Sequence, residues 1–339
     1  MKKSIFTFCC FILSFSGAQA IPVKKTNFAE LFAHASSVVG AQVIEVDPSA
    51  KTARVYGYPA DGLSVFEARL RIGAVYKGNP PASGISVCFL RVPADPGVFI
   101  DLKVGSAYLL FLQNAEPVSL LSDVQNGAFQ VDPLALRETA AFPSNRIEAL
   151  FQRSSTSPNI EVVVKALQAL AFVGTSNSLP VVEGLVSSTN DEVRLAAATA
   201  AVRLGDWKRI EDIVTFWEGR SYGNDGYIGF PDHNLASTSW ATVGEVSAKE
   251  ASPVVSRMLH QAKSTRIKRT LIQTLLSIND PQGVSAVAPF IEDADSRVAY
   301  EAYVTVMKLR GRPCVTPELF ERDKAAIKDE IRKGCPQVK

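Results

Sequence analysis

The chain has 339 residues, of which 36 are basic and 34 acidic, and its apolar content is 47%. This apolar share excludes an intrinsically disordered chain and is sufficient for packed cores. The near balance of charge lacks the basic excess that is typical of nucleic-acid-binding proteins. A chain of this length has room for two domains.

The first twenty residues have the organisation of a secretory signal peptide. Lys2 and Lys3 precede an apolar run from Ile5 to Phe15, and Ala18-Gln19-Ala20 forms a small-residue cleavage site. The run is too short to span a bilayer, and no later stretch is apolar for long enough. We therefore expect export, with cleavage near Ala20, to the periplasm or to the outside of the cell. Removing this segment leaves equal numbers of basic and acidic side chains.

Residues 21–131 are expected to form a small antiparallel β-barrel domain. Phe66, Ala68, Leu70 and Ile72 alternate with charged residues, which is typical of a half-buried strand. Turn-forming residues separate this run from the others. The sequence predicts a helix at 27–35 and strands at 38–46, 51–58, 66–72, 85–92, 107–113 and 129–131.

Short motifs in this domain carry a family resemblance. They are Ser37-Val38-Val39 with Ala41-Gln42-Val43, Val75-Tyr76-Lys77-Gly78, and Lys103-Val104-Gly105 before Tyr108-Leu109-Leu110-Phe111-Leu112. Residues 26–131 thereby resemble the small OB-type barrels of exported bacterial proteins, a shape shared with netrin modules and tissue metalloprotease inhibitors. Those inhibitors chelate zinc through an N-terminal cysteine, whereas the expected mature terminus here is Ile21-Pro22. The resemblance implies the fold, and protease inhibition by the barrel is kept as an alternative function.

Residues 132–158 are interpreted as an interdomain linker with one short helix, because Pro133, Pro143 and a Ser-rich stretch interrupt the pattern. From residue 159 to 312 the pattern is helical and repeats. Val162 and Val193 are 31 residues apart, as are Ile267 and Val298. The longer gap between Val193 and Ile267 indicates one further unit, near residues 235–261, with an insertion ahead of it.

The most regular unit runs from Ser188 to Trp217. Asn190 or Asp191 is expected to cap a first helix with one apolar face, Gly205 ends it, and a second helix runs from Trp207 to Trp217. Asn190–Ala197 and Asp295–Ala302 are similar to the D-x-x-V-R-x-x-A signature of HEAT repeats. The resemblance covers residues 159–312 and implies an α-solenoid of about five helical hairpins, a fold that mostly serves protein-binding scaffolds. A subset that resembles phycobilin lyases handles pigments, but these repeats carry no chromophore motif.

Residues 313–339 are expected to form a polar C-terminal capping helix. Cys314 and Cys335 flank it, and because export permits disulfides, we predict that they pair. Cys88 lies in a strand-like run and is interpreted as a buried free thiol, with a reactive or intermolecular cysteine as the alternative. Cys9 and Cys10 lie within the signal peptide, and a lipoprotein signal is the alternative interpretation there.

The insertion at residues 218–234 has the most unusual composition in the chain. It combines four glycines with Tyr222, Tyr227 and Phe230, which makes it a candidate binding loop, and His233 is added as a fourth candidate. The alternative is that these rings fold back as a plug over the repeats. A metal site from Asp225, Asp232 and His233 is a weaker hypothesis, because their spacing fits neither a calcium loop nor a zinc pair, and we expect no metal and no cofactor.

No catalytic motif is recognisable in the sequence. His34 and His260 end helices, which leaves His233 as the histidine in a loop, and there is no nucleophile elbow, phosphate loop or H-E-x-x-H motif. The basic cluster Lys263–Arg269 is interpreted as a solvated turn, with an anionic partner as the alternative. The sequence therefore predicts a non-catalytic scaffold that binds another protein and no nucleic acid. A hydrolase or metal-dependent enzyme using His233 is the alternative, and the partner and oligomeric state stay open.

Overall fold

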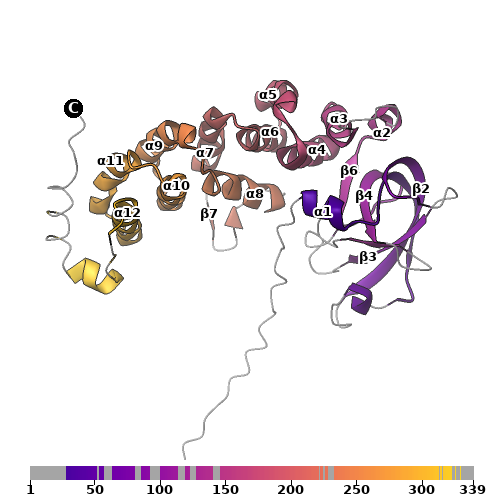
Figure 1. The fold of residues 1–339 in the computed structure, drawn as a ribbon, viewed down its shortest axis with the longest axis horizontal. Coiled ribbons are helices and arrows are strands. Elements are labelled where there is room, and N and C mark those ends of the chain that lie inside the picture. Colours follow the sequence, from indigo (N-terminus) through magenta and orange to yellow (C-terminus); the bar gives the residue numbers. More distant parts are fainter. Residues whose placement is uncertain are drawn as a thin grey trace, which may run out of the picture.

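The fold is that of a computed structural model of the chain. It describes residues 28–51, 53–56, 63–80, 85–91, 100–113, 119–122, 127–139, 146–220, 222–223, 226–227, 233–312, 314, 316–322, 325 and 329. A closed β-barrel comes first and a row of helices follows (Figure 1). Within the described residues, no helix combines the length and the apolar character that a membrane span requires. The predicted signal peptide lies outside these residues.

The barrel has five strands in the closed order β1-β2-β3-β5-β4-β1, and a sixth strand, β6, pairs with residues 107–110 of β4, next to the residues of β4 that pair with β5. All pairs are antiparallel except β3–β5, which is parallel. This arrangement confirms the predicted OB-like barrel. The elements are α1 (Phe28–His34), β1 (Ser37–Pro48), β2 (Ser64–Lys77), β3 (Ile85–Arg91), β4 (Ala107–Gln113), β5 (Ser119–Leu121) and β6 (Ala128–Val131).

The predicted strand at residues 51–58 is wrong. Ala53–Tyr56 instead forms a 3-10 helix that covers one side of the barrel. The Tyr56 hydroxyl donates to the carbonyl of Cys88 and accepts from the amide of Leu121, at 3.1 Å. The segment therefore contacts β3 and β5 through the Tyr56 side chain and adds no strand to the sheet. Strand β5 was not predicted from the sequence.

Cys88 is buried under this segment, as predicted, and its thiol is free. Burial raises the pKa of the thiol, and the nearby charge of Lys51 only partly offsets that effect. Because the thiolate is the reactive form, this burial disfavours the reactive state of Cys88.

The described parts of the segment at residues 132–158, which are 132–139 and 146–158, are packed structure and not the linker expected from the sequence. It contains α2 (Pro133–Thr139) and α3 (Arg146–Ser154). Leu150 and Phe151 of α3 are fully buried, and Phe129 of β6 packs edge-on against Phe151 at 5.9 Å between ring centroids. Pro133 begins α2 and Ser154 ends α3, so neither residue marks an exposed connection.

The barrel has a hydrophobic core of its own, and a second cluster joins the barrel to the helices. This second cluster of buried side chains includes Val38, Leu109 and Phe111 of the barrel and continues into the helical row. Leu136 of α2 lies over Gly40 and Gly73 on β1 and β2, where a Cβ atom on Gly40 would lie 2.0 Å from Leu136 Cδ1. The close approach requires glycine at residue 40, so α2 is fitted directly onto the barrel wall.

The helical row forms two layers and a shallow arch, with the barrel at one end (Figure 1). Helices α4, α6, α8, α10 and α12 form the inner layer and contact one another in that order, while α5, α7, α9 and α11 form the outer layer. Their bounds are α4 (Ile160–Val173), α5 (Leu179–Val186), α6 (Asp191–Arg203), α7 (Ile210–Glu218), α8 (His233–Gly244), α9 (Ser252–Gln261), α10 (Thr265–Ile278), α11 (Gly283–Val287) and α12 (Ser296–Leu309).

These hairpins follow the repeat read from the sequence. The extra unit expected near residues 235–261 is the pair α8 and α9, and the insertion lies between α7 and α8. Asn190 is the N-cap of α6, since its side chain accepts from the amides of Glu192 and Val193, and Gly205 follows the helix with φ +100°. Apart from its ends α6 is buried on all sides, not on the one face expected, because inner helices pack on both sides of it.

A buried carboxylate joins α3 to the first repeat. Glu148 Oε1 accepts hydrogen bonds from the Thr175 amide at 2.8 Å, the Thr175 hydroxyl at 2.9 Å and the Ser178 hydroxyl at 2.5 Å. Burial opposes ionisation of Glu148, but these three donors outweigh it and lower its pKa.

Acid should therefore weaken this junction. Because the folded-state pKa of Glu148 lies below its unfolded value, the stabilisation is complete above about pH 4.3 and is lost as the pH falls through the folded-state pKa. We expect Glu148→Gln to be less stable than wild type at pH 7 and the difference to narrow on acidification, measured by urea denaturation followed by circular dichroism. Glu183→Gln, at an exposed position, is the control. A difference that stays constant down to pH 3 would contradict the role of Glu148.

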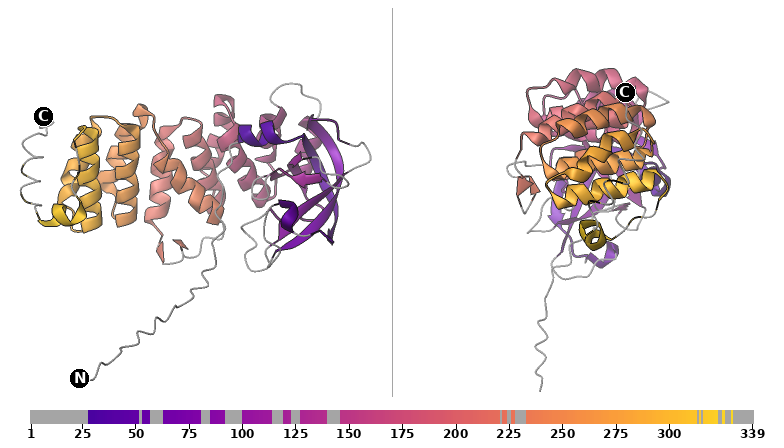
Figure 2. Two further views of the ribbon diagram at one scale, coloured as in Figure 1. Left: turned by 60° about the horizontal axis from the view of Figure 1, so that its bottom comes forward. Right: turned by 90° about the vertical axis from the view of Figure 1, so that its left-hand side faces the viewer.

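Helical residues 317–322 cover the far end of the row (Figure 2). Phe320 is buried there, stacked on Tyr303 at 4.9 Å between ring centroids. Cys314 is exposed and carries a free thiol in the structure, and Cys335 lies outside the described residues. Their disulfide stays a prediction.

Candidate binding surface

The insertion leaves the row where α7 ends and returns where α8 begins. Its described part is a pair of antiparallel strands, β7 (Tyr222–Gly223) and β8 (Gly226–Tyr227), in which Tyr222 is opposite Tyr227. The strands project beyond the helix ends (Figures 1 and 2). The structure thus brings together the backbones of two of the four predicted binding residues.

The other sequence candidates are placed less fully. His233 is the first residue of α8, and its side chain, like those of Tyr222 and Tyr227, is outside the described part of the structure. Phe230, Asp225 and Asp232 lie outside the described residues. In the described part of the chain, no group of three or more histidine, cysteine, aspartate or glutamate side chains is arranged to hold a metal ion.

An ion-pair cluster fixes the start of the insertion to the neighbouring repeat. Asp191, the first residue of α6, accepts from the guanidinium of Arg194 through one carboxylate oxygen and from that of Arg220 through the other. The Arg220 guanidinium also lies 4.3 Å from the ring centroid of Phe216. Arg220 is the second residue after α7, so this cluster sets the direction in which the chain leaves the helix.

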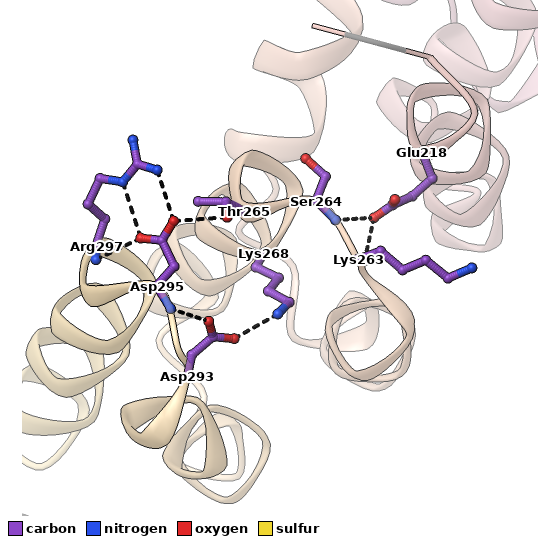
Figure 3. A network of polar contacts seen from close by, with 8 residues as sticks. All are labelled: Glu218, Lys263, Ser264, Thr265, Lys268, Asp293, Asp295 and Arg297. Atoms are coloured by element: carbon purple, nitrogen blue, oxygen red, sulfur yellow. Dashed lines mark hydrogen bonds and ion pairs between the residues drawn. The ribbon is translucent and has the colours of Figure 1, made fainter.

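Glu218 fixes the same point to a repeat on the other side. Its Oε1 accepts from the backbone amides of Lys263 at 2.8 Å and Ser264 at 3.2 Å (Figure 3). Ser264 is the N-cap of α10 and makes no side-chain cap of its own. A carboxylate at this position satisfies unpaired helix amides and interacts favourably with the positive end of α10.

Aromatic side chains join the two helices that flank the insertion. Trp217 of α7 donates from Nε1 to the Ser239 hydroxyl of α8 at 3.1 Å, in a buried contact. The Trp217 and Trp240 rings are stacked at 6.1 Å between centroids, and the Arg266 guanidinium lies 5.8 Å from the Trp240 ring. The insertion therefore spans two helices that are held together beneath it.

Polar contacts continue along the same edge to the last repeat (Figure 3). Asp293 accepts from Lys268 at 2.7 Å, and Asp295 accepts from Thr265 and from Arg297. The hydrogen bonds from Arg297 hold the pKa of Asp295 well below its ordinary value. We call these contacts the polar edge: Asp191, Arg194, Glu218, Arg220, Lys263, Ser264, Thr265, Lys268, Asp293, Asp295 and Arg297.

The predicted basic cluster at residues 263–269 belongs to this edge. Lys268 pairs with Asp293 and Arg269 with Glu301, so two of its four charges are neutralised by acids within the fold. Residues 263 and 264 precede α10 and residues 265–269 lie within it, so the interpretation of this cluster as a solvated turn is wrong for most of its residues.

An exposed aromatic ring lies on the inner layer, where sequence analysis predicted no site. Phe172 of α4 is 48% exposed, and the Arg203 guanidinium of α6 lies 5.4 Å from its ring centroid. Arg203 also donates to the Thr242 hydroxyl at 3.0 Å and to Glu245 at 2.6 Å, both near the end of α8. Phe172 and Arg203 are 31 residues apart, so the repeat period places them at equivalent positions in neighbouring repeats. The period does not show that the Phe172 ring is exposed.

Comparison with known proteins identifies the repeats. Residues 147–218 match the family model for HEAT repeats. The match begins within α3 and ends with α7, so it covers the hairpins on the barrel side of the insertion. This confirms the predicted HEAT-like solenoid. No curated protein matches the chain.

Proposed function

We propose that this protein is an exported, non-catalytic scaffold that binds another protein through the insertion and the adjoining polar edge. HEAT repeats commonly mediate protein interactions, and their stacked helices provide an extended surface. One observation carries the proposal. The repeat is interrupted at a single place in the described row, and the residues that flank the interruption are tied to α6, α8 and α10.

The composition of the insertion supports a binding role. Aromatic side chains with few rotatable bonds supply contact area at a low entropic cost, and two tyrosines are carried on the paired strands β7 and β8. The secretory features of the first twenty residues support a partner in the periplasm or outside the cell.

The test uses the full chain and a variant in which a glycine-serine linker replaces residues 221–231. This replacement keeps Arg220 and the polar edge intact. We expect the variant to retain the wild-type unfolding midpoint and to lose at least about tenfold in partner capture, measured by quantitative cross-linking from the native envelope. Glu211→Gln is the matched control, since its ion pair with Arg257 joins α7 to α9 away from the insertion.

Three outcomes would overturn the proposal. Unchanged capture by the linker variant would remove the insertion from the binding surface. Turnover in a broad activity screen that is lost in His233→Ala would favour the enzyme hypothesis instead. Inhibition of a protease by the wild-type chain that persists in the linker variant would favour the barrel as an inhibitor.

A further inference from the structure

We infer that the Asp191–Arg220 ion pair is a latch that orients the β7–β8 strands, which makes Asp191 and Arg220 positioning residues of the proposed binding surface. The biological role of the latch rests on the proposed function. Its structural effect, which is to restrict the motion of β7 and β8, can be measured without a partner. The latch consists of three described residues: Asp191 at the start of α6, Phe216 near the end of α7, and Arg220, which follows the C-cap of α7.

The geometry restricts Arg220 from two directions. Its guanidinium donates to Asp191 Oδ2 and lies over the Phe216 ring, while its backbone amide donates to the Trp217 carbonyl at 3.1 Å. An ion pair with a stacked guanidinium has a defined orientation, because both the planar donor group and the ring restrict rotation. Tyr222, at the start of β7, is only two residues further along the chain.

Asp191 is held as firmly as Arg220. Its second carboxylate oxygen accepts from Arg194, and Arg194 also donates to the Ser188 carbonyl at 2.9 Å. A carboxylate in the first turn of a helix is favoured by the helix dipole. Asp191 therefore provides a fixed acceptor whether or not the insertion is bound to a partner.

The partial exposure of both side chains indicates that the latch affects the insertion and not the stability of the whole row. The side chains of Arg220 and Asp191 are 28% and 46% exposed, so their ion pair contributes little to global stability. Losing it should loosen the paired strands without unfolding the row. Looser strands together with unchanged global stability would distinguish a positioning role from a purely structural one.

The test is amide hydrogen exchange at residues 222–227 in Arg220→Gln, Arg220→Lys and Asp191→Asn, beside the unfolding midpoint of each variant. We expect Arg220→Gln and Asp191→Asn to exchange about twofold to fivefold faster than wild type with unchanged midpoints. Arg220→Lys, which keeps the charge but loses the planar guanidinium, should exchange at a rate between those of wild type and Arg220→Gln. The double variant should be no faster than the faster single variant, because both remove the same interaction.

Arg257→Gln is the matched control, because its 2.7 Å ion pair with Glu211 also involves α7 but joins that helix to α9. Unchanged exchange in Arg220→Gln, or equal acceleration in Arg257→Gln, would overturn the latch. A fall in the midpoint that accounts for the faster exchange would also overturn it. Hydrogen exchange tests the latch, and partner capture by the linker variant tests the proposed function. Either hypothesis can therefore fail without the other.

Discussion

Gly40→Val is expected to lower the free energy of unfolding by about 1–3 kcal/mol. Gly40 lies in β1, opposite Ala74 of β2, and valine is a favourable strand residue, so the backbone itself does not oppose the change. The cost comes from Leu136, whose Cδ1 would lie 2.0 Å from the new Cβ atom. Leu136 is only 4% exposed, and its other methyl group lies over Gly73, so it has little space to move aside.

The measurement is urea denaturation followed by far-ultraviolet circular dichroism. Gly184→Ala is the matched control: Gly184 is in α5, a Cβ atom added there would meet no other atom within 4 Å, and the change should stabilise by about 0.5–1 kcal/mol. Leu136→Ala in the Gly40→Val background should cost less than Leu136→Ala alone, because it removes the clash. If the losses in free energy of unfolding for Gly40→Val and Leu136→Ala were additive, the side chains at positions 40 and 136 would not compete for the same space.

This prediction also concerns how the two parts of the chain are joined. Leu136 connects the barrel to α2, Phe129 connects β6 to Phe151 of α3, and Lys103 pairs with Glu161 of α4 at 2.9 Å. These contacts place the barrel in the position that a preceding repeat would occupy against α3 and α4. The barrel thus covers one end of the solenoid, as terminal caps do in other repeat proteins.

The sequence predicted elements whose apolar period is simple. Alternation in β2 and the repeat spacing of α4, α6, α10 and α12 each reflect burial that recurs at a constant interval. The 3-10 helix at Ala53–Tyr56 was missed because its position depends on one hydroxyl bonding to two distant strands, which no local pattern records. The same reason explains the misread linker, where helices α2 and α3 are stabilised by contacts with the barrel.

The candidate surface was predicted only in part. The insertion stands out in the sequence because it interrupts the repeat, and its aromatic residues are visible directly. Asp191 was named only as a possible helix cap, and Glu218 and Arg220 were not singled out, because a charged residue at a helix end usually interacts only with its own helix. Their pairing across repeats depends on the stacking distance of the hairpins, which sequence spacing does not give.

Phe320→Ala is expected to uncover the far end of the solenoid. Phe320 is fully buried between Tyr300 and Tyr303, whereas the other described residues from 314 onward are exposed, so its ring is the main apolar contact of the described part of the terminal helix. Removing a buried phenylalanine ring typically costs about 3–5 kcal/mol, which exceeds what a short isolated helix gains by itself. The helix at residues 317–322 should therefore detach and expose the two tyrosines.

Two measurements follow from this loss. Amide exchange in α12 should rise by more than about tenfold, because terminal repeats lose stability first when their neighbour is removed. Light scattering should show concentration-dependent association through the exposed apolar end. Leu319→Ala on the same helix is the control, since Leu319 is 37% exposed and should leave both readouts near wild type. Wild-type exchange in α12 of Phe320→Ala would mean that the repeat is stable without its cap, and that Phe320 contributes only to its own segment.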